Sequence, residues 1–295
     1  ITADDRKKLV DWCYGVVDHC QFSRETVASA MEMVDRFLSM PSDSDSGNAV
    51  ARVSHEALRD QTKFQLLNVA ALYTSIKVNE EKAISSDLFA EIGRLFYTAE
   101  EIEDRERTLL SGLSWQCHAP TAYQIGLSIL SLILPYVDIP EVTWGVIMDE
   151  MKYLTELAVR DCYSTTERAS TIALAATFNA ICDSDSSTKE CREVLGAFLR
   201  VIMECFDFDD SEQIIAARRR LHSLTKPGTE AAELSLLGLR GPSPEMNNRS
   251  PTRRVMGYCP TGLGAFDVVI ALRRYDARPW AKRGMQGLDG RSRNS

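Results

Sequence analysis

The sequence predicts an all-α protein with two tandem five-helix domains followed by a tail. Apolar residues recur every three or four positions along most of the first 225 residues, which is the period of an amphipathic helix. Two Ala-rich segments, one in each half, are apolar on nearly every face, as expected for a helix at the centre of a bundle. At 295 residues and 44% hydrophobic, the chain is long enough to form two cores.

The first domain is expected within residues 1–118. Its five predicted helices span 3–20, 23–39, 63–80, about 86–93 and 98 to about 112. Thr2 is the expected N-cap of the first helix, and the segment TAEE at 98–101 predicts a capping box that begins the fifth. Residues 40–60 contain Pro, Gly and a Ser/Asp run, so we expect a solvated loop there.

The second domain is expected within residues 119–226, where Pro120 is well placed to start a helix. Its predicted helices span 120–134, 140–160, 165–182, 187–206 and 209–224. A shift of 105 residues superimposes the two Ala-rich segments, placing Ala70, Ala71, Tyr73, Ser75 and Ile76 on Ala175, Ala176, Phe178, Ala180 and Ile181. This indicates either an internal repeat or a chance agreement between two Ala-rich helices.

Residues 227–295 are predicted to form a disordered, basic tail rich in Gly and Pro. The part from 231 onwards holds 8 of the 16 glycines, 5 of the 10 prolines, and 11 Lys and Arg against 5 Asp and Glu. It therefore carries +6, and residues 1–230 carry −14 of the total of −8. Such a composition cannot bury enough apolar surface to fold.

The acidic body excludes some kinds of partner. Binding to a phosphate backbone depends on clustered cations, so we expect no nucleic-acid partner.

No apolar run reaches the length of a membrane span, so we expect no membrane association. The eight cysteines include no CxxC pair, which favours a reducing compartment. Because the chain begins with Ile, we also expect the natural protein to begin earlier.

Enzyme motifs are missing from the sequence. The four histidines give no HExxH or ExxH spacing, and there is no P-loop and no GxSxG elbow. The segment GLGAF at 262–266 begins like a nucleotide-binding fingerprint, but Asp267 stands in place of its third glycine. We therefore expect no enzymatic activity, no metal and no cofactor.

The sequence resembles the cyclin family. The segments RKKLVDWCYGVVDHCQFSRETVASAMEMVDRFLS, KFQLLNVAALYTSIKVNE and TAEEIEDRERTLLSGLSWQCHAPT are similar, in this order, to the first cyclin box. Residues 120–224 resemble the more variable second box, so the resemblance covers about residues 5–225. It implies two cyclin-fold domains. The segment SPTRR at 250–254 is similar to a Ser-Pro motif near the C-terminus of some cyclins, including algal ones.

The resemblance implies a regulatory subunit that binds and activates a cyclin-dependent Ser/Thr kinase in cell-cycle control, located in nucleus and cytoplasm. In cyclins a Lys ending the third helix and a Glu in the fifth contact the kinase, and these positions match Lys77 and Glu106. Val78 and Leu110 would add apolar contacts. Without the resemblance, Lys77 could simply favour its helix dipole, and Glu106 could be one surface charge among many.

Two further sets of residues match cyclin positions. Arg6 and Asp35 match an ion pair that ties the first helix to the second. Leu9, Trp12 and Gln65 match a patch that docks Arg-x-Leu motifs of kinase substrates or inhibitors. In the second box, the 105-residue shift places Cys182 and Ser211 at the positions of the contact pair, which predicts that the first box alone contacts the kinase.

The sequence also departs from the cyclin pattern. Val78 replaces an aromatic residue and Asn79 replaces a Glu, which leaves the choice of kinase open. Asp5 and Lys8 replace the Met and Ile of the docking patch, so we expect weak substrate docking. Ser250 precedes a proline and lies three residues before Arg253, which makes it a candidate phosphorylation site. Two alternatives remain: a cyclin-fold transcription factor or scaffold that binds DNA or peptides, and a degenerate cyclin that activates nothing.

Overall fold

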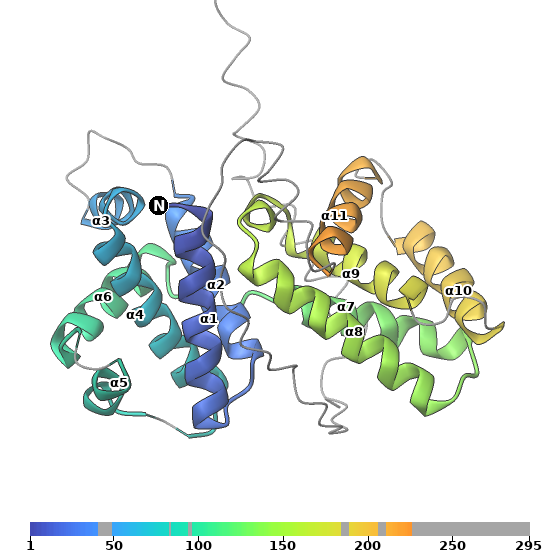
Figure 1. Cartoon of the computed structure of the whole chain (residues 1–295), viewed down its shortest axis with the longest axis horizontal. Helices are drawn as coiled ribbons and strands as arrows, with labels where there is room; N and C mark the ends of the chain where they lie inside the picture. Colours follow the sequence, from blue (N-terminus) through green and yellow to red (C-terminus); the bar gives the residue numbers. More distant parts are fainter. Residues whose placement is uncertain (41–48, 83, 94–95, 184–188, 206–210, 226–295) are drawn as a thin grey trace, which may run out of the picture.

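The protein is all-α, as predicted. The computed structural model describes residues 1–40, 49–82, 84–93, 96–183, 189–205 and 211–225, and every regular element in these segments is a helix. The helices form two groups that lie side by side, α1–α6 and α7–α11 (Figure 1). Each group encloses its own hydrophobic core.

The N-terminal group is built around one buried helix. Its elements are α1 (Ala3–Cys20), α2 (Glu25–Leu38), α3 (Ala49–Arg59), α4 (Gln61–Asn79), α5 (Ser86–Ile92) and α6 (Ala99–Gly112). The helix α4 is buried nearly all round from Phe64 to Ile76 because α2, α3 and α6 pack on different sides of it. Reciprocal capping boxes fix the starts of α1 at Thr2 and of α6 at Thr98, as the sequence predicted.

The prediction of a loop over residues 40–60 is wrong for most of this segment. Residues 49–59 form α3, which packs against α4 through Val53, Ser54 and Ala57. These three residues recur at helical spacing, but the stripe is only two turns long and follows a segment rich in Pro, Ser and Asp. The N-terminal group therefore contains six α-helices rather than five in the part that the structure describes.

The C-terminal group repeats this plan. Its elements are α7 (Ala122–Ile133), the 3₁₀ turn η1 (Leu134–Tyr136), α8 (Glu141–Arg160), the 3₁₀ turn η2 (Tyr163–Thr166), α9 (Ala169–Asp183), α10 (Lys189–Cys205) and α11 (Ser211–Leu224). The Ala-rich helix α9 is central, with α7, α8 and α11 packed around it. The two Ala-rich segments thus hold the same place in their groups, which favours the repeat over chance agreement.

Polar contacts join the two groups where α1 and α2 meet α8. Arg6 donates from Nε to the carbonyl oxygen of Val159 at 3.2 Å, and Arg24 pairs with Glu156 at 2.9 Å. A third contact links the hydroxyl of Thr121 to the carboxylate of Glu25 at 2.5 Å. Burial raises the pKa of Glu25, and the hydrogen bond from Thr121 opposes part of that rise.

Two predictions concern residues outside the described part of the chain. These are the predicted tail, 227–295, and the candidate phosphorylation site Ser250. Among the described helices, none is long and apolar enough to cross a membrane.

Candidate functional site

The structure joins Lys77 and Glu106 across two neighbouring helices. Lys77 lies in the last turn of α4, and Glu106 lies in the middle of α6, which packs along α4. The Nζ atom of Lys77 donates to both carboxylate oxygens of Glu106, at 3.1 Å and 2.9 Å. The pair therefore lies beside the C-terminal end of α4.

Two residues of α4 hold this pair in place. The hydroxyl of Thr74 shares its proton between Oε1 of Glu106 at 3.1 Å and the carbonyl oxygen of Ala70 at 2.9 Å, and Tyr73 places the centre of its ring 4.8 Å from Nζ of Lys77. Tyr73 packs in turn on Phe89 of α5, with ring centroids 5.4 Å apart. Sequence reasoning missed Thr74 and Tyr73, although their positions three and four residues before Lys77 place them on the same helix face.

Burial differs sharply between the two members of the pair. The side chain of Glu106 is 9% exposed, whereas that of Lys77 is 42% exposed. The carboxylate thus acts as a fixed internal anchor, and the ammonium reaches the surface, where an N–H can also serve a partner. This arrangement suits recognition of acceptor groups on another protein and provides no nucleophile or proton-transfer chain.

The residues around the pair offer limited apolar surface. Val78 is partly exposed beside Lys77, whereas Leu110 is nearly buried within the bundle. Asn79 is exposed, and its Nδ2 donates to the hydroxyl oxygen of Ser75 at 3.0 Å. The carboxylate of Glu80 accepts from the backbone N–H of Ser23 at 3.0 Å, so this residue anchors α4 to the chain before α2.

Arg6 and Asp35 form a bidentate ion pair that also reaches the second group. Nη1 and Nη2 of Arg6 donate to the two oxygens of Asp35 at 2.7 Å and 2.9 Å, while its Nε donates to Val159. Burial raises the pKa of Asp35 above its ordinary value, and the nearby Arg6 opposes part of that rise. The pair thus ties α1 to α2, and Arg6 alone extends the tie to α8.

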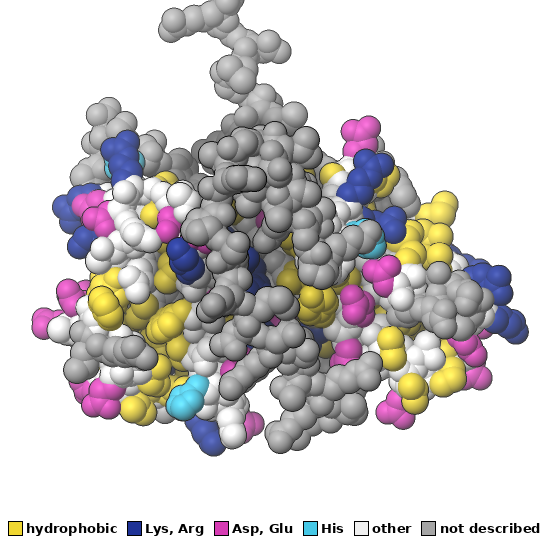
Figure 2. All heavy atoms as spheres, in the orientation of Figure 1, with side chains coloured by type: hydrophobic (Ala, Val, Ile, Leu, Met, Phe, Trp, Pro, Cys, Tyr) yellow, Lys and Arg dark blue, Asp and Glu magenta, His cyan; other side chains and the backbone are white. Residues whose placement is uncertain are grey.

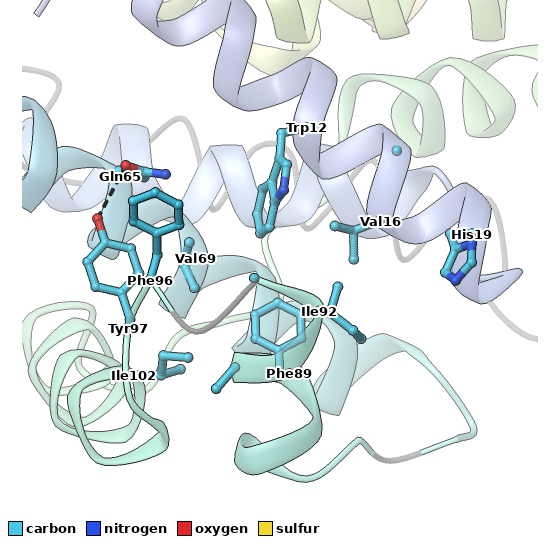
Figure 3. A pocket seen from close by; sticks show the side chains of 13 residues that line it. Trp12, Val16, His19, Gln65, Val69, Phe89, Ile92, Phe96, Tyr97 and Ile102 are labelled. Atoms are coloured by element: carbon cyan, nitrogen blue, oxygen red, sulfur yellow. Dashed lines mark hydrogen bonds between the residues drawn. The ribbon is translucent and has the colours of Figure 1, made fainter.

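A groove of about 500 Å³ lies between α1, α4 and α5 and the segment that precedes α6 (Figure 3). Trp12 and Gln65 of the predicted docking patch both line it, whereas Leu9 does not. Most of the other lining side chains are apolar, among them Phe89, Ile92 and Phe96. Gln65 accepts a hydrogen bond from the hydroxyl of Tyr97 at 3.3 Å.

Asp5 and Lys8, the two charged replacements in the predicted patch, both form polar contacts with neighbouring side chains. Asp5 closes the capping box with Thr2 and accepts from Nε2 of Gln61 at 2.7 Å. Lys8 is exposed and pairs with Asp4 at 2.6 Å. Neither Asp5 nor Lys8 lines the groove.

The second bundle corrects one sequence-based assignment. Cys182 lies at the end of α9, as the 105-residue shift predicts, but Ser211 is the first residue of α11. Arg218, seven residues later, is the α11 residue that bonds Asn179, the counterpart of Thr74. A single shift fails here because α10 is ten residues longer than α5, so the chain between the central and last helices has a different length.

No cluster of three or more His, Cys, Asp and Glu side chains suited to a metal ion occurs among the described residues. Burial raises the pKa of the Cys13 thiol to about 12, so this cysteine is a neutral core residue.

Comparisons with known proteins show what the sequence and the fold are similar to. Residues 1–118 match the family model "Cyclin, N-terminal domain". Over 180 residues the chain is 27% identical to the G2/mitotic-specific cyclin C13-1 of Daucus carota, and over 184 residues it is 24% identical to the putative cyclin-A3-1 of Arabidopsis thaliana. Each match covers 61% of this chain but only 47% and 45% of those relatives, about half of their length.

A solved structure shares the fold over most of the chain. A viral cyclin from herpesvirus saimiri is similar with a TM-score of 0.52 at 11% sequence identity, covering 76% of this chain and 87% of the viral one. The match spans more than the N-terminal group alone, in agreement with two helical groups of one plan. Residues 1–118 therefore match the N-terminal domain of cyclins, and most of the chain shares the fold of a viral cyclin.

Proposed function

We propose that this chain is a regulatory subunit, without catalysis of its own, that binds and activates a cyclin-dependent Ser/Thr kinase in cell-cycle control. The observation that carries the proposal is the Lys77–Glu106 pair, whose anchor is buried and whose ammonium is exposed at the end of α4. The proposed contact surface comprises this pair together with Val78 and the small exposed part of Leu110. The proposed locations are nucleus and cytoplasm.

The pair is suited to grip a backbone rather than a particular side chain. Lys77 is held by a fixed carboxylate and by the ring of Tyr73, so it loses little side-chain freedom when it donates to a carbonyl oxygen of the partner. Docked beside the regulatory αC helix of a kinase, the surface would favour the inward position of that helix. This position completes the Lys–Glu ion pair that phosphoryl transfer requires.

The alternative of a DNA-binding cyclin-fold factor has less support. Its binding face would have to be basic, whereas residues 1–230 carry −14. A degenerate cyclin remains the stronger alternative, because Asn79, which bonds the hydroxyl of Ser75, stands where many cyclins carry a Glu. Such a protein would bind a kinase without activating it, or would bind none.

The test is capture followed by reconstitution. The immobilised full chain should retain a cyclin-dependent kinase from a lysate of dividing cells, identified by mass spectrometry. Adding the chain to that purified kinase should then raise its substrate phosphorylation. Retention without activation would identify a degenerate cyclin, and no retained kinase would refute the proposal altogether.

A further inference from the structure

The second helical group contains a polar site at the place that Lys77 and Glu106 occupy in the first. The helix α11 packs along α9 as α6 packs along α4. Phe178 and Asn179 of α9 correspond to Tyr73 and Thr74. Asn179 contacts α11 at Arg218, as Thr74 contacts α6 at Glu106. Both sites thus consist of an aromatic and a polar residue on the central helix and a charged residue on the last helix.

Arg218 is held rigidly at this site. Its Nε donates to Oδ1 of Asn179 at 3.0 Å, and Nδ2 of Asn179 donates to the carbonyl oxygen of Arg218 at 2.9 Å. The guanidinium carbon lies 3.5 Å from the centre of the Phe178 ring, which itself packs edge-on against Phe198. A stacked face and a bonded Nε fix the plane of the guanidinium group.

Among the described residues, no hydrogen bond engages the two terminal nitrogens of Arg218. In the described part of the chain, Arg218 forms no ion pair with a carboxylate. The neighbouring Arg220 differs, because it binds Asp161 through Nε and Nη2 at 3.1 Å and 2.9 Å. Arg6 is likewise saturated by Asp35. Arg218 is therefore a preorganised fork that lacks the acid its geometry suits.

The charge at this site is opposite to that at the first. Glu106 is replaced by Arg218, and the cationic Lys77 is replaced by the thiol of Cys182. A partner group that binds Lys77 beside the buried Glu106 would therefore find no equivalent cation and carboxylate at the second site. The second site instead requires an anion, and a planar guanidinium favours a carboxylate bound through two parallel hydrogen bonds.

The surroundings extend the site along α11. Arg219 follows on the exposed face, and Ile215, one turn earlier, is 44% exposed. Lys and Arg side chains gather over α11 on the visible face (Figure 2). Two carboxyl groups also lie in this region, Asp183 of α9 and Glu150 of α8. Burial raises the pKa of Glu150, and the nearby Asp183 raises it further. These carboxyl groups reduce the positive potential of the site.

We propose that the edge formed by α9 and α11 around Arg218 binds an acidic peptide segment of a partner protein. One carboxylate of the segment would lie against the outer edge of Arg218, and an adjacent apolar residue would cover Ile215. The tail of this chain is the wrong occupant, because residues 231–295 carry +6. The proposal does not depend on kinase binding, since it concerns the other helical group.

The test uses an array of random decapeptides of graded net charge, probed with the labelled full chain. Peptides with Asp or Glu beside an apolar residue should be enriched among those bound. The strongest binder and its Asn/Gln isostere are then compared by fluorescence anisotropy. Loss of the carboxylate should weaken binding about 10-fold or more, as expected for charge-assisted hydrogen bonds.

Matched variants assign the effect to the fork. Arg218→Gln should weaken the acidic peptide about 10-fold or more, and Arg218→Lys should recover only part of this, because a lysine cannot bind bidentately. Arg192→Gln changes the net charge equally at an exposed position of α10 and should stay within about twofold. Circular dichroism must show that all variants are folded.

Three outcomes would overturn the proposal. The array could show no preference for acidic peptides, or Arg218→Lys and Arg218→Gln could both bind as tightly as the natural chain while folded. Alternatively, analytical ultracentrifugation could show self-association that Arg218→Gln abolishes, which would make a second copy of this chain the occupant.

Discussion

Replacing Arg6 by methionine should destabilise the protein more than any single change at an exposed ion pair. Arg6 is 6% exposed and makes three hydrogen bonds, two to Asp35 and one to the carbonyl oxygen of Val159. Methionine preserves most of the aliphatic volume. The Arg6→Met change therefore isolates the loss of these polar contacts from the loss of packing.

The expected size follows from the geometry. Removing one partner of a buried ion pair typically costs about 3–5 kcal/mol, because the other charge stays buried without compensation. The side chain of Asp35 is 27% exposed, so water can partly solvate it, and we expect the lower end, about 3 kcal/mol. For a folded unit of this size, that corresponds to a fall in Tm of roughly 6–12 °C.

The penalty should also depend on pH. Burial raises the pKa of Asp35, and removal of Arg6 removes the main opposing effect, so the pKa rises further in the variant. A folded state that holds a proton more tightly than the unfolded chain loses stability as the pH rises above the ordinary value, here 3.8. The penalty of Arg6→Met should thus be smaller near pH 4 than at neutral pH.

Urea denaturation followed by circular dichroism at both pH values measures this. The Asp35→Asn variant serves for comparison, because it leaves the more deeply buried Arg6 guanidinium without its counter-charge and should also destabilise the protein, but with no comparable dependence on pH near 4. A penalty of less than about 1 kcal/mol for Arg6→Met at neutral pH would show that the bidentate pair and its link to α8 do not stabilise the fold.

Three other predictions concern stability and docking. Burial raises the pKa of Glu25, so the natural chain should lose stability relative to Glu25→Gln as the pH rises from 4.5 to neutral, whereas parallel denaturation curves would refute this. A Cβ on Gly126 would lie 2.5 Å from a methionine sulfur, so Gly126→Ala should cost about 1–3 kcal/mol, whereas Gly145→Ala in open space should not lower the Tm. Arg-x-Leu peptides should bind weakly in fluorescence anisotropy, and changing Asp5 to Met and Lys8 to Ile should improve binding; tight binding by the natural chain would contradict this.

Most of the helices could be predicted from the sequence because their apolar stripes are long. The second group has all five predicted helices, and the buried α4 and α9 stand out through their Ala-rich segments. The helix α3 was missed because its stripe is short and its stability comes from packing on α4 rather than from local sequence. Tertiary contact decides such segments.

The site could be predicted only in part. The resemblance matched Lys77 and Glu106, but no pattern showed that Thr74 and Tyr73 brace them. The partner of Asn179 was missed because a fixed shift cannot follow a connection whose length changes between the two groups. Nor did any pattern show that Glu103 of α6 accepts from the hydroxyl of Ser86 at 2.6 Å and so links α5 to α6.

The most direct test of kinase regulation uses the Lys77→Ala variant. Its affinity for the captured kinase and its ability to activate that kinase are both measured. Truncating one member of a desolvated charged pair typically costs about 2–5 kcal/mol, so the Kd should rise roughly 30-fold to several thousand-fold and activation should be lost at ordinary concentrations. Lys63→Ala, an exposed lysine at the other end of α4, is the matched control and should change little. If Lys77→Ala is folded yet binds and activates the kinase like the natural chain, the proposed contact site is wrong.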